Sequence, residues 1–308
     1  MTPQDSTPEA PTYLRLLRNT NSPRGYVVLG ALAILVGWMV VGVVILGFQQ
    51  AIRKDPEGTV SWFGLLATNL TLIVLIPLSM VVAQKLNGQA PGLLSSVVGR
   101  LRWRPLAWFA LIAVALELVM LAVIQFGNIE LAGAEQHGGG AAPDAVAVIA
   151  VTVLTSSFQA AGEEYFFRGY LLQAVGALVR SSVIAILVTT LLFTIAHGIW
   201  PWQSPALFLD RFAFGLVAAL LVIRTGGLEA SIAAHAANNV VTFIFAALTD
   251  SVGASLGVKD APWGLVTLDV VKFVAFGAIA LWLARRFKLD NVCTLPLTGT
   301  AAPGTRLV

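Results

Sequence analysis

The chain has 308 residues, of which 57% are hydrophobic and only 11% charged, with a formal net charge of +3. Soluble domains carry roughly 25% charged residues, so this composition excludes a set of soluble domains and favours a polytopic helical membrane protein. The basic residues sort into alternate loops instead of forming a patch, which argues against nucleic acid as a partner, and the lone Cys293 excludes an internal disulfide.

Eight apolar runs have about the length that crosses the roughly 30 Å hydrocarbon core of a bilayer as a helix. In chain order they cover 26–48, 61–83, 106–126, 145–163, 183–199, 206–223, 228–248 and 264–284. The fourth run can continue to about residue 179. The sequence therefore predicts an all-α fold, a polytopic membrane bundle of about eight transmembrane helices that occupies residues 26–284.

The polar ends, 1–25 and 285–308, are expected to be short flexible cytoplasmic segments. The first apolar run is too long for the apolar part of a signal peptide, so we expect it to stay as the first span. Segment 127–144 has three consecutive glycines and no basic residue, which indicates a flexible exterior loop.

The placement of basic residues tests this topology. With the N-terminus in the cytoplasm, the exterior loops contain only Arg53, Lys54 and Lys259 out of 19 basic residues. Arg211 and Lys272 fall within spans, and the others lie in segments assigned to the cytoplasm. This asymmetry fits the positive-inside rule. An odd number of spans would remove it, so both termini are expected to be cytoplasmic in an integral, multi-pass protein of a prokaryotic plasma membrane.

Three ionisable side chains stand together beside an apolar stretch in "AGEEYFFRGYLL", residues 161–172. Adjacent helical residues point about 100° apart, so Glu163 and Glu164 cannot share one role. Glu164 and Arg168 have the i, i+4 spacing, with the acid first, that favours an ion pair. The spacing predicts that these two neutralise each other and leave Glu163 free to act on something else. The alternative is an interfacial cluster that extends to the headgroups.

Two of the three histidines, His197 and His235, also lie in apolar runs, and Asn239 follows His235 at i+4 on the same helical face. A single membrane histidine usually serves as hydrogen-bonding glue between helices. Glu163, His197 and His235 are a plausible set of ligands for a divalent metal such as zinc. A metal-free site remains open, in which Glu163 deprotonates water and the histidines or the amide stabilise the oxyanion.

Other intramembrane charges have simpler interpretations. Asp269 and Lys272 are expected to pair at i, i+3, and Asp210 and Arg211 can be interfacial. Glu117 has no evident partner in the sequence. The chain contains neither the His-Glu-x-x-His helix of the common zinc proteases nor the Gly-x-Ser-x-Gly turn of serine hydrolases.

Three motifs in chain order carry a resemblance to a known family. They are "EEYFFR" from Glu163, "FTIAH" ending at His197, and "HAANN" from His235 to Asn239. In this order, on successive membrane helices, they resemble the CPBP family. That family comprises the type II CAAX prenyl endopeptidases and the bacteriocin-processing or bacteriocin-immunity proteins, also called the Abi family. The similarity covers about residues 145–250, the expected protease-like core.

The resemblance implies an intramembrane endopeptidase that hydrolyses a peptide bond of a membrane-associated or lipidated peptide or protein. It implies Glu163 as the group that activates water, His197, His235 and Asn239 as the other essential polar residues, and Glu164 and Arg168 in supporting roles. Two alternatives stay open. One is a non-catalytic immunity or adaptor protein on the same fold, and the other is a transporter or channel, for which the sequence shows no internal repeat.

The endopeptidase interpretation requires that Glu163 lie well inside the membrane, close to His197 and His235. A helix from Asp144 to Arg180 would be about 54 Å long, too long for one upright span, so a break or strong tilt is expected. Glycines recur every seven residues on one face of this segment, at 162, 169 and 176. They permit a kink or close packing against a neighbouring helix.

Overall fold

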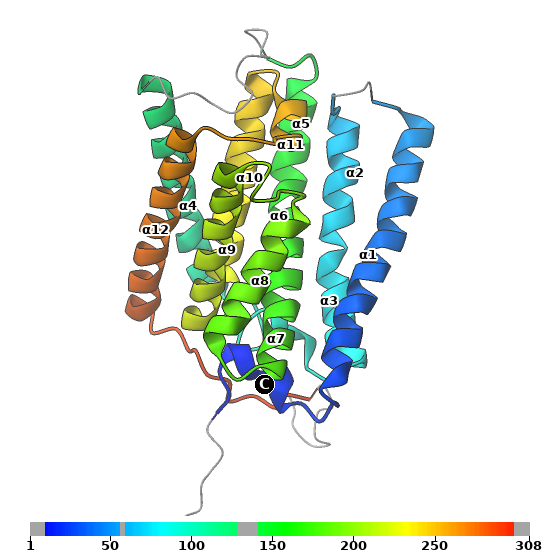
Figure 1. The fold of residues 1–308 in the computed structure, drawn as a ribbon, viewed down its shortest axis with the longest axis vertical. Coiled ribbons are helices and arrows are strands. Elements are labelled where there is room, and N and C mark those ends of the chain that lie inside the picture. Colours follow the sequence, from blue (N-terminus) through cyan, green and yellow to red (C-terminus); the bar gives the residue numbers. More distant parts are fainter. Residues whose placement is uncertain (1–9, 56–58, 128–140, 299–308) are drawn as a thin grey trace, which may run out of the picture.

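The protein is an all-helical bundle without a sheet in the computed structural model, which describes residues 10–55, 59–127 and 141–298 (Figure 1). The helices are α1 Gly25–Ile52, α2 Trp62–Ile73, α3 Leu75–Lys85, α4 Trp103–Phe126, α5 Ala145–Val151, α6 Ser157–Glu164, α7 Leu172–Leu178, α8 Ser182–Ala196, α9 Pro205–Thr225, α10 Glu229–Leu248, α11 Val252–Leu256 and α12 Trp263–Arg286. The expected exterior loop lies largely outside the described residues, as do residues 1–9 and 299–308 of the expected ends.

Within this described part, seven helical segments are long and apolar enough to cross a membrane. The chain is therefore a multi-pass membrane protein. The eight expected apolar runs all form helix, but the fifth ends at Ala196 after 15 residues, about 22 Å. The chain then reverses at Gly198, where a φ of 71° suits glycine. In Figure 1, α8 rises beside α7 and ends before it reaches the far end of the bundle.

The outer surface of the bundle is apolar. Long stretches of α1 expose aliphatic side chains, with Val43 73% and Val44 66% exposed. Buried polar groups gather inside instead, as where Arg102 before α4 pairs with Glu229 at the start of α10 at 2.6 Å. An apolar outside around a polar inside suits hydrocarbon as the surrounding solvent.

The two described ends of the chain meet at one end of the bundle (Figure 1). The Cys293 amide donates to the Pro11 carbonyl at 2.8 Å, and Thr12 pairs with Val292 in an isolated bridge. The side chain of Tyr13 is fully buried, and Arg15 donates to carbonyls at the end of α7, including Val179 at 2.6 Å. Residues 10–24 thus pack against the bundle, in contrast to the loose segment expected from their polarity, because they bury the side chains of Tyr13, Leu14, Leu16 and Leu17.

The helix that carries the two glutamates runs without a break from Ala145 to Leu178, 34 residues. Of the expected break or strong tilt, the break is therefore absent. The helix instead widens into π-helical turns at Thr152–Ser156 and Tyr165–Leu171. Such widened turns inside α-helices occur frequently at functional sites. Close packing at glycine is confirmed, because a Cβ at Gly162 would lie only 2.0 Å from the Leu72 carbonyl oxygen.

Gly162→Ala is expected to lower the free energy of unfolding by about 1–3 kcal/mol, because the added methyl forces this helix away from the helix that carries Leu72. Thermal unfolding of the purified protein in detergent, followed by circular dichroism, measures the loss. Gly169→Ala is the matched control, since its Cβ would meet neighbours at 3.6 Å, an ordinary contact. Equal stability of the two variants would contradict the close approach at Gly162.

Candidate active site

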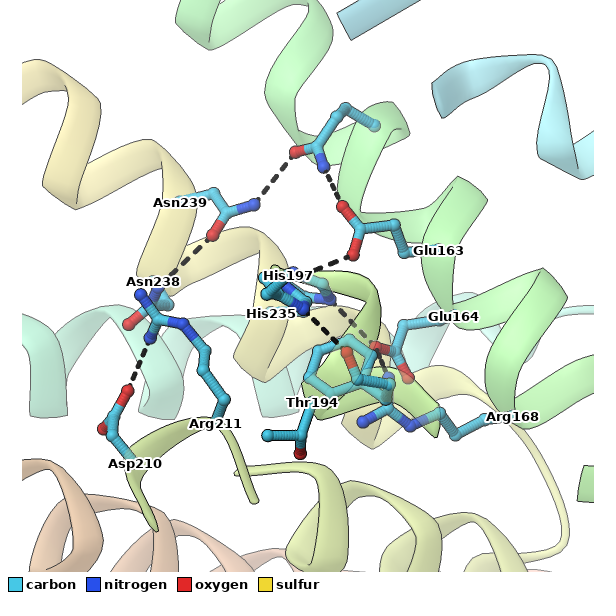
Figure 2. Close-up of polar contacts among 12 residues, drawn as sticks. Glu163, Glu164, Arg168, Thr194, His197, Asp210, Arg211, His235, Asn238 and Asn239 are labelled. Carbon is cyan, nitrogen blue, oxygen red and sulfur yellow. Dashed lines mark hydrogen bonds and ion pairs between the residues drawn. The ribbon is translucent and has the colours of Figure 1, made fainter. Parts of the chain in front are cut away.

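The structure brings the predicted site residues together around a cavity of about 240 Å³ inside the bundle. Glu163 comes from α6, His197 follows the last residue of α8, and His235 and Asn239 stand on α10. All four line the cavity. Figure 2 shows their side chains converging from these separate elements.

Glu163 lies in the middle of the long helix and is only 8% exposed. Its Oε2 lies 3.9 Å from Nε2 of His197, and its Oε1 accepts a hydrogen bond from the Gln159 amide (Figure 2). No arginine or lysine of the described chain lies within ion-pair distance of it. Glu163 thus has a neutral donor on one oxygen and a histidine near the other.

The predicted ion pair between Glu164 and Arg168 is confirmed, with 2.8 Å between Oε1 and Nη1 and both side chains buried. The same Oε1 lies 2.8 Å from Nδ1 of His235. His235 therefore contacts the second glutamate, where the sequence-based hypothesis placed it beside the first. The Arg168 guanidinium also stacks over the Phe193 ring, 3.9 Å from its centre, so aromatic contact contributes to holding a buried cation.

The hydrogen bonds of the two histidines define which ring nitrogens remain free. Nδ1 of His197 lies 2.8 Å from the carbonyl oxygen of Phe193. In a neutral imidazole, an acceptor at that distance places the proton on Nδ1 and leaves Nε2 with its lone pair. The carboxylate of Glu164 fixes His235 in the same tautomer. Both residues therefore keep Nε2 free at the cavity they line.

Gln159 is a residue that the motif-based reasoning missed. Its Oε1 accepts from Nδ2 of Asn239 at 2.9 Å, and its amide nitrogen donates to Glu163, so it bridges the two. It is buried. The sequence spacing could have indicated this contact, because Gln159 precedes Glu163 by four residues on the same helix. A glutamine side chain at i−4 can reach a glutamate one turn later.

The donor set does not fit a metal ion as the side chains are arranged. Within the described chain, no group of three or more His, Cys, Asp and Glu side chains is placed to hold one. His235 is engaged by Glu164, and Glu163 and His197 form only a pair. Zinc sites in proteins use at least three protein ligands. The chemistry below is therefore derived from the protein's own groups.

The remaining intramembrane charges form a second cluster. The predicted pair of Lys272 and Asp269 is confirmed at 2.7 Å, and Glu117 finds its partner in the same Lys272 at 2.9 Å. Asp210 is 2% exposed and pairs with Arg211 at 2.5 Å. The Asp210 carboxylate is therefore buried within the protein, on the first turns of α9, which begins at Pro205.

Comparison with known proteins adds two findings. Residues 145–241 match the family described as type II CAAX prenyl endopeptidase, Rce1-like. The chain is also 29% identical over 149 residues to the uncharacterized protein YyaK of Bacillus subtilis (strain 168). That alignment covers 46% of this chain and 50% of the relative, so the chain spans about half the length of the curated relative it matches. The matched range contains Glu163, His197, His235 and Asn239, the four predicted site residues that line the cavity.

Proposed function

We infer that the chain carries a domain of the type II CAAX prenyl endopeptidase family of Rce1-like proteins, because residues 145–241 match that family and the three motifs resemble the CPBP family. On this premise we propose that it is an intramembrane endopeptidase of a prokaryotic plasma membrane. Its substrate is a membrane-associated or lipidated peptide or protein. The observation that carries the proposal is the pair of Glu163 and His197, 3.9 Å apart in a buried cavity.

The proposed general base is Glu163. Its separation of 3.9 Å from His197 is too long for a direct hydrogen bond but lets one water bond to both side chains. Glu163 takes a proton from this water as its oxygen attacks the carbonyl carbon of the peptide bond. His197 accepts a hydrogen bond through Nε2 and orients the water. General bases placed in this way accelerate reactions by about 10²–10⁴-fold.

The proposed oxyanion donor is the amide of Asn239. Its nitrogen carries two hydrogens, of which Gln159 accepts one. The second is available to the negative oxygen that forms in the tetrahedral intermediate. Glu163, now a carboxylic acid, returns its proton to the leaving nitrogen as the C–N bond breaks. The water is thereby divided between the new carboxylate and the new amine.

His235, Glu164 and Arg168 have supporting roles in this mechanism. Arg168 balances the charge of Glu164, and Glu164 holds His235 through Nδ1. The free Nε2 of His235 then accepts a hydrogen bond from an amide N–H of the bound substrate. This arrangement leaves Glu163 as the carboxylate of the pair without a buried cation against it, which suits a base.

The test of the proposed function is a comparison of membrane peptides in cells that produce the wild-type protein or Glu163→Gln. Peptides released by the wild type and missing with the variant identify the substrates and the cleaved bonds by mass spectrometry. Identical peptide sets at equal protein levels would contradict peptidase activity. Elemental analysis of the purified active protein, with and without chelator, tests the metal-free mechanism, since stoichiometric zinc lost together with activity would refute it.

Gln159→Met is expected to lower kcat by about 10–100-fold with little change in KM, because it removes the donor that holds Glu163 and the acceptor that holds Asn239. Methionine retains the volume of the buried side chain. Steady-state kinetics on a peptide found in the cellular comparison measure both constants. A change confined to KM, or no change, would argue against a positioning role. Gln173→Met is the matched control, a glutamine that is equally buried but bonded to Gln89 outside the cavity.

A further inference from the structure

A second and larger cavity, of about 580 Å³, lies between α4, α9, α10 and α12. It adjoins the cavity of the candidate site, because several side chains line both. These shared residues are Arg211, Asn238, Thr242, Ser255 and Val258. A peptide whose scissile bond lies beside Glu163 therefore has room for a flanking side chain in the larger cavity.

The larger cavity has more carboxylates than cations. Its charged lining consists of Glu117, Asp210 and Asp269 against Arg211 and Lys272. Lys272 is held between two of the acids, at 2.9 Å from Glu117 and 2.7 Å from Asp269. One carboxylate is therefore in excess when all five groups are ionised. An uncompensated charge inside a membrane protein is costly and commonly marks a functional site.

One carboxylate oxygen of the cavity, Oδ1 of Asp210, has no donor in the described part of the chain. Its Oδ2 pairs with Arg211, but its Oδ1 is buried and has no hydrogen-bond partner among the described residues. The whole residue is only 2% exposed. Figure 2 shows the Asp210 carboxylate bonded to Arg211 through one oxygen. A buried carboxylate oxygen left without a donor costs free energy that a bound ligand's N–H group would recover.

We propose that this cavity is a specificity pocket for a basic side chain, lysine or arginine, of the peptide substrate, with the Asp210 carboxylate as its acceptor. The inference rests on the proposed peptidase function and adds the substrate class. A cationic guest brings the charge of the pocket to zero and supplies the missing donor to Oδ1.

The apolar lining suits the same guest. Met120, Leu121 and Ile124 of α4 and Leu265 of α12 face the cavity together with the charged groups. Long basic side chains bury an aliphatic stem against apolar surface and place the charged head at a polar group. A neutral aliphatic side chain would fill the region of the stem but leave Oδ1 of Asp210 without a donor.

The proposal is tested with palmitoylated, internally quenched peptides in which one arginine is moved through each position around the cleaved bond. Each peptide has a partner with citrulline, which has the same shape and no charge. Purified wild-type protein in lipid nanodiscs is expected to favour arginine over citrulline at one fixed position by about 10-fold or more in kcat/KM, as for close buried charge pairs. Asp210→Asn is expected to reduce this ratio to near unity while retaining cleavage of the citrulline peptide.

A wild-type protein with no preference for arginine at any position would overturn the inference, and so would an Asp210→Asn variant that keeps the preference. In either case, cleavage that depends on Glu163 leaves the proposed function standing. If Asp210→Asn does not fold, Asp269→Asn replaces it. That change removes the excess negative charge of the cavity, because Glu117 and Asp210 are then balanced by Arg211 and Lys272. An undiminished arginine preference in Asp269→Asn therefore also overturns the proposal.

A binding measurement tests the proposed pocket even if no peptide is cleaved. Fluorescence anisotropy measures the binding of the arginine and citrulline peptides to Glu163→Gln, with and without Asp210→Asn. Tighter binding of the arginine peptide that is lost on adding Asp210→Asn supports the pocket, and equal dissociation constants overturn it. If the wild type cleaves nothing, the peptidase proposal fails while this measurement still decides the charge preference.

Discussion

Glu163→Gln is expected to lower kcat by about 10²–10⁴-fold, the usual contribution of a general base, while the melting temperature stays close to that of the wild type. The variant keeps the shape of the side chain and an oxygen that accepts the hydrogen bond from Gln159. It loses only the ability to take a proton from water. Purified protein in nanodiscs, with a peptide identified from cells, gives both kcat and the melting temperature.

Glu164→Gln is the adjacent comparison and is expected to behave differently. It removes the charge that balances Arg168 at 2.8 Å and weakens the bond to His235. Both activity and melting temperature should therefore fall. A Glu163→Gln variant that retains turnover, or one that unfolds as readily as Glu164→Gln, would contradict the assignment of Glu163 as the base.

Arg168→Met is expected to destabilise the protein by about 3–5 kcal/mol, because it leaves Glu164 as an unpaired charge in the core. The two side chains are 3% and 0% exposed, so water cannot take over the lost contact. The variant also lacks the stacking of the guanidinium over the Phe193 ring. Unfolding of the detergent-solubilised protein, followed by tryptophan fluorescence, measures the change in stability.

The double variant Glu164→Gln, Arg168→Met should recover part of this loss, since it removes both buried charges at once. Arg180→Met is the matched control, an exposed arginine just beyond α7 for which a change within about 0.5 kcal/mol is expected. Equal effects at 168 and 180 would show that the buried ion pair has no special part in stability. A double variant less stable than either single one would point the same way.

The membrane-spanning fold follows closely from local sequence. Each apolar run forms a helix, because a run of this kind satisfies its backbone hydrogen bonds within one segment. The predicted run to residue 199 passed the end of α8 at Ala196 by three residues, His197, Gly198 and Ile199. The reversal depends on Gly198 and on the packing of α8 against α9, which is tertiary. The packing of residues 10–24 was missed for a similar reason, because their burial depends on groups far along the chain.

In the candidate site, contacts within one helix could be predicted from the sequence, and contacts between helices could not. The pairing of Glu164 with Arg168, and of Asp269 with Lys272, could be predicted because both partners lie on one helix about a turn apart. The partner of Glu117 could not, because Lys272 lies 155 residues away. Nor could the contact of His235 with Glu164, 71 residues apart, since helical spacing assigned Glu164 to Arg168 and left Glu163 for the histidines.

By itself, the sequence determined that this protein is an all-helical membrane bundle with Glu163, His197 and His235 within its apolar runs. Both follow from hydropathy and helical spacing, which act between near neighbours. Only the tertiary structure decided which glutamate each histidine contacts, that Gln159 bridges Glu163 to Asn239, and that an acidic cavity adjoins the site. Those features arise where α4, α6, α8, α9, α10 and α12 pack together, and the angle at which helices pack determines which side chains meet.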